Sequence, residues 1–442
     1  MLAHSISIGF SYGILGSFTV AQSKYLNLSI YESSWTGATH LSTFFLTTPL
    51  TTALAKNISP SLLQITGGVL MLLGVGATAW AKEQWHSILS FGLVTGLGIS
   101  LVRSASAAAL PFYFQNEFVK FAMASVMIGF TIGMSALPLV CNYIFSMDDF
   151  PKTMFDVSKI MFLHLLCGLI FLPISIQNPE AKGIKTQNLT KSEVYQGVVL
   201  PLVKIIKSFK VWSYLLAALL RRFALTAFFT LITNYLMIQQ RLSGQEVAQF
   251  RMTLGCMSVV GVVAMCITQN EKFNRLIPHA IGPFICGVVM MSITLAENDI
   301  SLSMLMALFG LAFGSLLGNT TPAINTLVSE EEVKLVLMLE CIMDGLGSVG
   351  GSPSTSYIQE ETNLNTGLYF AGAFCMLSGL IMLLLTACKI REDKSRKDYS
   401  EEERTTQTII RIKPYDHSQS KFSVKQVNVE LLPLLSSDMA SP

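Results

Sequence analysis

The feature that most constrains this chain is a series of about twelve apolar segments, each long enough to cross a lipid bilayer. A membrane-spanning helix needs about 20 mostly apolar residues. Only 13% of the 442 residues are charged and 51% are hydrophobic, whereas soluble domains carry about 25% charged residues. Because lipid offers no hydrogen-bond partners to the backbone, we expect a bundle of membrane-spanning helices.

The spacing of the apolar segments predicts two groups of six helices. The first segment begins almost at Met1 without a basic leader, so we interpret it as a span and not as a signal peptide. The sequence thus predicts an N-terminal half (1–176), a central cytoplasmic linker (177–210), a C-terminal half (211–389) and a disordered cytoplasmic tail (390–442). The predicted spans are 2–21, 36–56, 61–80, 86–112, 119–144, 158–176, 211–238, 247–268, 276–296, 300–320, 333–357 and 365–389.

The distribution of basic residues predicts the orientation of the bundle. Lysine and arginine are most frequent in the linker and at the start of the tail, and the positive-inside rule places such segments in the cytoplasm. Both termini are therefore expected to be cytoplasmic. Examples of these basic residues are Lys182, Lys185, Lys191, Lys389 and Arg391.

Four short runs carry a resemblance to a known family. They are Ile6–Gly13, Tyr25–Trp35, Gly96-Leu97-Gly98 and Gly310–Gly314. In this order and spacing they resemble the first helix, first outer loop, fourth helix and tenth helix of the monocarboxylate transporter family, a branch of the major facilitator superfamily. The resemblance covers nearly all of 1–389. It implies an all-α membrane protein with twelve transmembrane helices in two six-helix halves, and a substrate site between the halves near the midplane.

The resemblance also implies partners and a location. The expected substrate is a small organic anion or another solute that bears a carboxylate, and the expected membrane is the plasma membrane. A single-pass glycoprotein escort is the partner that the family would suggest, although the sequence shows no docking site for one. The lipid bilayer is the other partner.

Three ionisable positions of the family are missing from this chain. A family lysine falls at Gly16, and the aspartate and arginine of the eighth helix fall near Met257 and Gly261. In the family these positions are associated with handling protons and carboxylates. We therefore expect transport without the usual proton coupling, with symport as the less favoured mode. The same loss motivates an alternative, a non-transporting membrane scaffold or sensor derived from the family.

Three arginines lie inside predicted spans, where a charge costs roughly 2.5–3.5 kcal/mol on insertion scales and usually has a function. They are Arg221 and Arg222 in the seventh span and Arg103 in the fourth. A guanidinium suits a carboxylate because it can form two parallel hydrogen bonds. Adjacent helical residues point about 100° apart, so we expect one of the neighbouring pair to face the central cavity and the other a neighbouring helix.

Two acids in the eleventh span offer an alternative to substrate contact. Glu340 and Asp344 are four residues apart and share a helical face, so they are candidates for structural ion pairs with the arginines. Either acid could instead bind a coupled proton. If both acids faced an open cavity and the arginines turned away, the sequence would favour a hydrophobic amine or steroid-like substrate.

Other polar residues of the spans receive weaker predictions. Tyr12 and Asn319 are candidate substrate-binding residues, and for Tyr12 a bond to a backbone carbonyl is equally favoured. Arg251 lies near the outer end of its span, so we expect its side chain to reach towards the interface. The repeat Gly310, Gly314 and Gly318 predicts close helix packing.

The remaining signals bear on sorting and on excluded functions. Glu430, Leu434 and Leu435 fit an acidic dileucine sorting motif. The alternative is that they form an apolar end of the tail without a sorting role. Because of the motif, the endolysosomal membrane is a second candidate location. The six histidines are scattered, and the sequence has no Walker loop and no nucleotide fingerprint. We therefore expect no enzyme, no primary pump, no cofactor, no metal and no nucleic-acid partner.

Overall fold

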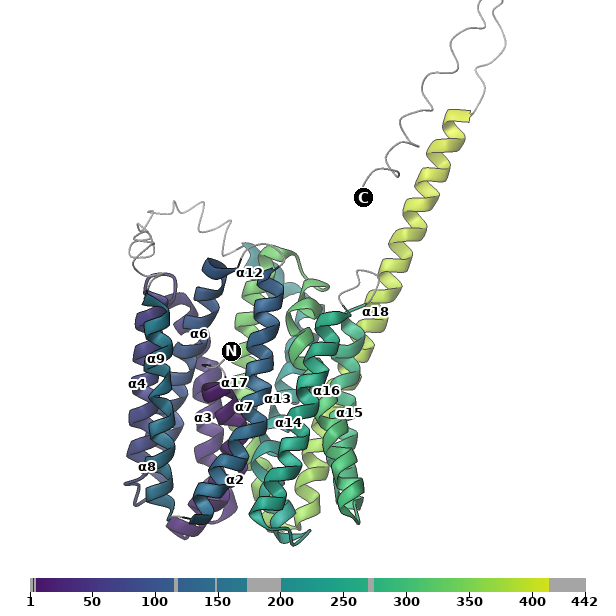
Figure 1. Cartoon of the computed structure of the whole chain (residues 1–442). Helices are drawn as coiled ribbons and strands as arrows, with labels where there is room; N and C mark the ends of the chain where they lie inside the picture. Colours follow the sequence, from purple (N-terminus) through teal and green to yellow (C-terminus); the bar gives the residue numbers. More distant parts are fainter. Residues whose placement is uncertain are drawn as a thin grey trace, which may run out of the picture. The chain divides into compact units, whose positions relative to one another are not determined.

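The computed structural model describes residues 3, 5–114, 118–147, 149–172, 200–268 and 274–412. The described residues form long helices packed side by side (Figure 1). Nine of these helices are long and apolar enough to cross a membrane by length and composition. The helix of the first span is shorter than these nine helices, and the second and eleventh spans contain more polar residues than they do. Together they confirm the predicted twelve-helix architecture.

The first half contains six spans, three of which are built from more than one element. They are η1 (Ser5–Gly9) with α2 (Phe10–Leu26), α3 (Ile30–Leu54), α4 (Pro60–Thr78), α5 (Gln84–Ser87) with η2 (Ile88–Thr95) and α6 (Gly96–Tyr113), α7 (Phe118–Met147), and α8 (Phe150–Met161) with α9 (Leu163–Ile170).

The second half follows the short helix α12 (Leu200–Lys207). Lys204 on α12 pairs with Glu332 at 2.7 Å, which attaches this part of the predicted linker to the eleventh span. Residues 177–199 lie outside the described residues. The six spans are α13 (Phe209–Ile238), α14 (Gly244–Ile267), α15 (Leu276–Ser292) with η5 (Ile293–Leu295), α16 (Asp299–Asn325), α17 (Glu330–Glu361) and α18 (Leu364–Ile412).

The end of the chain differs from the sequence-based expectation. The chain divides into two units, residues 1–387 and 388–442. Residues 390–412, for which we predicted disorder, are helical. Lys389 and Asp393 are four residues apart and lie 3.2 Å from each other, and such a pair supports an exposed helix. Residues 413–442, with the predicted sorting motif Glu430–Leu435, lie outside the described residues.

The turn that enters the second span of each half is the same. Asn27 and Arg241 both have a left-handed backbone, with φ values of 54° and 56°. Each is followed by Leu-Ser-x-x-Glu, in which the serine and the glutamate form a capping box at the start of α3 or α14. A capping box satisfies the first backbone amides of a helix. This shared turn supports the description of the halves as structural repeats.

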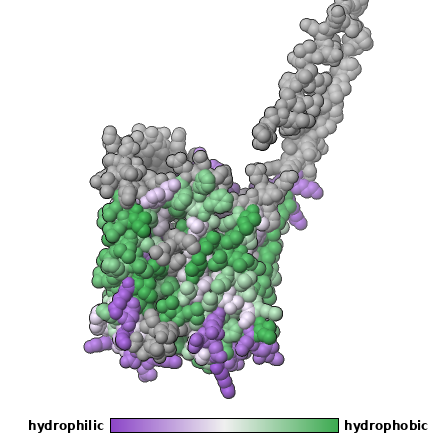
Figure 2. Space-filling model, viewed as in Figure 1, coloured by the Kyte–Doolittle hydropathy of each residue, from purple (hydrophilic) through white to green (hydrophobic). Residues whose placement is uncertain are grey.

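The outer surface of the bundle suits a lipid environment. Figure 2 shows a largely hydrophobic face with hydrophilic residues gathered at its lower edge. Large apolar side chains are exposed on several helices, including Leu73, Phe121, Met304 and Leu384. In a soluble protein such exposure would be costly, whereas in a bilayer these side chains face lipid.

The tenth span packs against the eighth through its glycines, which confirms the predicted small-residue interface. An added Cβ at Gly310 would lie 2.1 Å from the carbonyl oxygen of Leu254, and one at Gly314 would lie 2.0 Å from that of Ser258. Such close approach of two backbones is possible only without side chains at these positions.

A Gly314→Ala substitution is therefore expected to lower the free energy of unfolding by about 1–3 kcal/mol, because the new methyl group forces α16 away from α14. Thermal unfolding of the purified protein in detergent measures this change. Gly244→Ala is the matched control, since a Cβ at Gly244 meets no atom within 4 Å. Equal midpoints for the two variants would contradict the close packing.

Candidate functional site

The two neighbouring arginines of α13 face different surroundings, as the helical geometry predicted. Arg221 is 5% exposed and points into the second half. Its Nη2 donates to Oε1 of Glu340 on α17 at 2.8 Å, and its Nη1 lies 3.0 Å from Nε2 of His279 on α15. Because a guanidinium can only donate, His279 accepts through Nε2 and carries its proton on Nδ1. Arg221 thus joins α13, α15 and α17.

Arg222 points towards the first half. Its Nη2 donates to Oδ2 of Asp344 at 2.7 Å, and its Nη1 donates to the hydroxyl of Tyr12 on α2. The guanidinium carbon also lies 4.3 Å from the centre of the Phe45 ring on α3. Arg222 is therefore the arginine of the pair that contacts both halves.

One polar atom of Arg222 and one of Asp344 retain bonding capacity. Nε of Arg222 and Oδ1 of Asp344 are buried and have no hydrogen-bond partner among the described residues. Buried polar groups are normally satisfied. The unused donor and acceptor lie where the halves meet, which is where a substrate would bind in this architecture.

Arg103 on α6 differs from the α13 arginines because it has no acidic partner within the part of the chain that the structure describes. It is half-buried, and its guanidinium carbon lies 5.5 Å from the centre of the Phe44 ring. No carboxylate of the described residues lies within 4.0 Å of it. The Phe44 ring centre lies 4.5 Å from that of Phe45, which Arg222 contacts, so Arg103 is near the same cluster.

Aromatic rings surround Tyr12 from both halves. Its ring centre lies 5.3 Å from that of Phe130 on α7 and 5.3 Å from that of Phe229 on α13. Phe313 on α16 is 6.5 Å away. These rings exclude water from one side of the arginine cluster, which strengthens the electrostatic interactions there.

Arg251 on α14 corrects one expectation. We expected its side chain to reach the interface, but it is only 3% exposed. Its Nη2 donates to the backbone carbonyl of Tyr12 at 2.6 Å, and its Nη1 to Oγ1 of Thr233 at 3.2 Å. The prediction was wrong because it used depth along the helix alone, whereas the side chain of Arg251 points into the bundle and reaches α2 and α13.

Sequence reasoning missed two histidines that the structure places at helix contacts. His279 accepts from Arg221, as described above. In the first half, His40 on α3 is buried and joins three helices: Nδ1 lies 2.9 Å from the carbonyl oxygen of Phe91, and Nε2 lies 2.9 Å from Oγ of Ser11. The scattered positions of these histidines in the sequence gave no signal of either contact.

Asn319 is not part of the arginine cluster. It is fully buried, and its Nδ2 donates to the backbone carbonyl of Arg275 at 2.6 Å, which ties α16 to the start of α15. The glycines of α17 likewise serve packing: Gly345 lies against Leu46, and Gly351 lies against the backbone of Phe223. The helix runs without interruption from Glu330 to Glu361.

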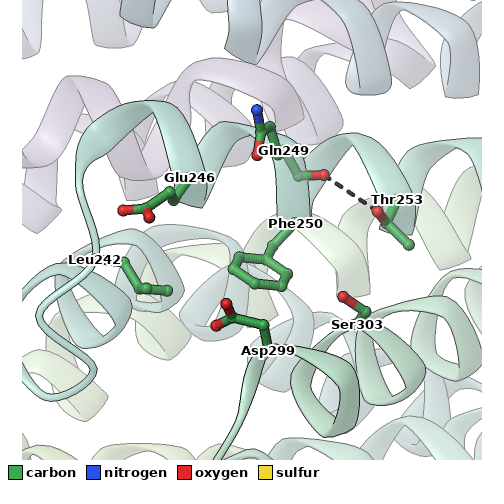
Figure 3. A pocket seen from close by; sticks show the side chains of 7 residues that line it. All are labelled: Leu242, Glu246, Gln249, Phe250, Thr253, Asp299 and Ser303. Carbon is green, nitrogen blue, oxygen red and sulfur yellow. Dashed lines mark hydrogen bonds between the residues drawn. The ribbon is translucent and has the colours of Figure 1, made fainter.

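A separate pocket of about 350 Å³ lies between the starts of α14 and α16. Figure 3 shows Glu246 and Asp299 on either side of the Phe250 ring, with Thr253 and Ser303 beyond it. Glu246 accepts from the backbone amide and the hydroxyl of Ser243, so it is already used in the helix cap. The pocket contains none of the predicted substrate-binding residues.

Comparison with known proteins decides the family. The model of the Major Facilitator Superfamily matches residues 1–339. The chain belongs to the major facilitator superfamily. Among curated relatives, rat (Rattus norvegicus) monocarboxylate transporter 13 is 23% identical over 85% of this chain and 85% of its own length. Monocarboxylate transporter 2 of Meriones unguiculatus is 22% identical over 90% and 87%. This facilitator is thus a divergent, monocarboxylate-transporter-like member.

Solved structures support the same fold. A crystal structure of a mutant of the peptide transporter POT in complex with sulfate superimposes with a TM-score of 0.66 at 14% identity, and it covers 88% of this chain and 94% of that chain. Within this fold, the predicted residues Tyr12, Arg221, Arg222, Glu340 and Asp344 come together, whereas Asn319 lies elsewhere. The family makes this facilitator an integral multi-pass membrane protein that transports a solute.

Proposed function

We propose that this facilitator moves a small organic anion with a carboxylate group by alternating access. The observation that carries the proposal is the charge balance at the centre of the bundle. Arg221 and Arg222 pair with Glu340 and Asp344, whereas Arg103 forms no ion pair with a carboxylate of the described residues and lies over the Phe44 ring. A buried positive charge is costly unless it is compensated. A substrate carboxylate would provide the missing compensation.

The pairing pattern argues against the amine alternative. A hydrophobic amine or steroid-like substrate would require both acids to face an open cavity, with the arginines turned away. Instead each acid accepts a hydrogen bond from an arginine. The remaining donors, Nε of Arg222 and the guanidinium of Arg103, are donors for an anion.

The contacts between the halves define one conformational state of the cycle. At the end that carries the α2–α3 turn, the amide of Tyr31 donates to Oε1 of Glu360 at 2.7 Å, and the rings of Tyr31 and Tyr357 are 5.6 Å apart. Gly16 on α2 lies against Thr233 and the Phe229 carbonyl of α13. With both termini in the cytoplasm, this closed end faces the outside. Rocking of the halves about the central cluster would open it.

The mode that we favour is facilitated diffusion. The family positions associated with proton handling are replaced by Gly16, Met257 and Gly261. The two candidate coupling acids, Glu340 and Asp344, are each engaged by an arginine in an ion pair between helices. The substrate would then move down its own gradient, in the plasma membrane.

Uptake into vesicles that contain the purified protein tests the proposal. The panel is labelled lactate, pyruvate, a ketone body, an aromatic amino acid and creatine, each with and without an inward proton gradient. We expect saturable uptake of at least one carboxylate and no acceleration by the gradient. Acceleration would establish symport, and absence of uptake by folded protein would favour the non-transporting scaffold.

A further inference from the structure

Tyr12 is held by two arginines of the opposite half at once. Arg222 donates to its hydroxyl and Arg251 donates to its backbone carbonyl. Tyr12 belongs to α2 of the first half, whereas Arg222 and Arg251 belong to α13 and α14 of the second half. One residue therefore carries two charge-assisted hydrogen bonds across the interface that must separate when this end opens.

The charge of Arg251 has no acidic partner in the described ranges of the chain. The side chain is buried, and both of its hydrogen bonds go to neutral oxygens, those of Tyr12 and Thr233. No carboxylate of the described residues lies within 4.0 Å of its guanidinium. A backbone carbonyl supplies only a dipole to a buried cation, so an anion would be a better partner.

The ring of Tyr12 has apolar surroundings and lies between the hydroxyl that Arg222 contacts and the backbone carbonyl that Arg251 contacts. It packs on Phe229 and Phe313, which both belong to the second half. When the halves separate, the hydroxyl, the ring and the carbonyl of Tyr12 would leave together. What remains on the second half is a pair of arginine donors with aromatic rings beside them.

We propose that Arg251 extends the proposed anion site at Arg222, and that the hydroxyl and backbone carbonyl of Tyr12 occupy these two arginines as a clasp while this end of the molecule is closed. The ligand class that fits the vacated space is a carboxylate with a flat apolar body, such as an aryl carboxylate. This inference rests on the proposed function, since the transported anion is what replaces Tyr12.

An anion that binds Arg222 and Arg251 would favour the state in which this end of the molecule is open. A ligand that binds only the open state shifts the population towards that state by its differential affinity. In the closed state Tyr12 accepts one hydrogen bond from each of the two arginines, and these bonds favour the closed state of the empty protein. An anion that takes both donors compensates for the loss of the clasp.

A native cysteine offers a reporter for the clasp. Cys141 is fully buried on α7, the helix that packs against both α2 and α14. The experiment uses the full chain in detergent, with the other seven cysteines replaced by serine, and measures the rate at which a water-soluble thiol reagent labels Cys141. In the wild-type background we expect slow labelling, and acceleration by benzoate.

Two variants weaken the clasp in different ways. Arg251→Gln removes the charge, and Tyr12→Phe removes only the hydroxyl that Arg222 contacts. Each is expected to raise the labelling rate about tenfold, because a hydrogen bond to a charged group that is lost on opening no longer favours the closed state. In Arg251→Gln, benzoate should no longer accelerate labelling, since one of the two anion donors is gone.

Thr233→Val is the matched control. It removes the other hydrogen bond of Arg251, which lies within the second half, and leaves the bond to Tyr12 in place. Labelling at the wild-type rate is expected. If Thr233→Val accelerates labelling as much as Arg251→Gln, or if Arg251→Gln and Tyr12→Phe label at the wild-type rate, the clasp is refuted.

Folding and transport are controlled separately. If Arg251→Gln does not fold, Arg251→Lys and Tyr12→Phe carry the test, and unchanged labelling in both would overturn the proposal. Labelling of Cys141 needs no flux, so a failure of the proposed function would appear as absent uptake with an intact labelling response to the variants. A failure of the clasp would appear as unchanged labelling in protein that still transports.

Discussion

Replacement of Glu340 by glutamine is expected to lower the free energy of unfolding by about 3–5 kcal/mol, because it leaves Arg221 buried without its counter-charge. The pair is almost completely buried, with exposed side-chain fractions of 6% for Arg221 and 7% for Glu340. His279 cannot compensate, since it is an acceptor without charge. Thermal unfolding in detergent measures the loss.

Two comparisons make this result specific. Lys204→Ala breaks an ion pair in which the lysine is 70% exposed, so its effect should stay within about 0–1 kcal/mol. The double variant Arg221→Met with Glu340→Leu should recover most of the stability, because buried ion pairs can often be replaced by apolar residues. A Glu340→Gln protein as stable as the Lys204→Ala protein would contradict the assigned pair.

Arg222→Lys is expected to reduce uptake of the transported carboxylate about tenfold or more. A lysine retains the charge but not the planar fork that reaches Asp344 and Tyr12 simultaneously. The loss of one hydrogen bond to a charged group is worth about 1.5–3 kcal/mol, and 1.4 kcal/mol corresponds to a factor of ten. Initial uptake rates in vesicles measure the effect.

The control for this variant is Lys24→Arg, an exposed basic residue in the last turn of α2. It should leave uptake unchanged, because it lies away from the central cluster. Wild-type uptake by Arg222→Lys would show that the geometry of the guanidinium is irrelevant, and the role of Arg222 would reduce to charge alone.

The spans and the central charge pairs could be predicted from the sequence because both follow from local rules. Length and hydropathy define a helix in lipid. The spacing of Glu340 and Asp344, and the adjacency of Arg221 and Arg222, determine helical faces without knowledge of neighbouring helices. For this reason the sequence could predict ion pairs between these acids and the arginines.

The remaining contacts depend on which helices pack together, and the local sequence does not specify which helices become neighbours. Arg251 and Tyr12 are far apart in the sequence, and they meet because α14 and α2 both pack against α7. The same holds for His279 beside Arg221 and for Asn319 at the start of α15. Depth along a helix misled the prediction for Arg251, because depth does not specify the face that a side chain occupies.

The helical start of the tail has a different explanation. Composition suggested disorder for 390–412, but its charged residues are good helix formers that also pair at four-residue spacing, as Lys389 and Asp393 do. A preceding span supplies the nucleus, which is the costly step of helix formation.

The most direct test of the central claim is a comparison of two ligands that share a ring and differ in charge. Purified wild-type protein and Arg103→Gln are heated with benzoate or with benzylamine, and the unfolding midpoints are compared. A surplus of positive charge at the centre predicts that benzoate stabilises the wild type, by about 2.7 kcal/mol at one hundred times its dissociation constant, and that Arg103→Gln loses this stabilisation. Stabilisation by benzylamine, or equal stabilisation of both proteins by benzoate, would contradict the account.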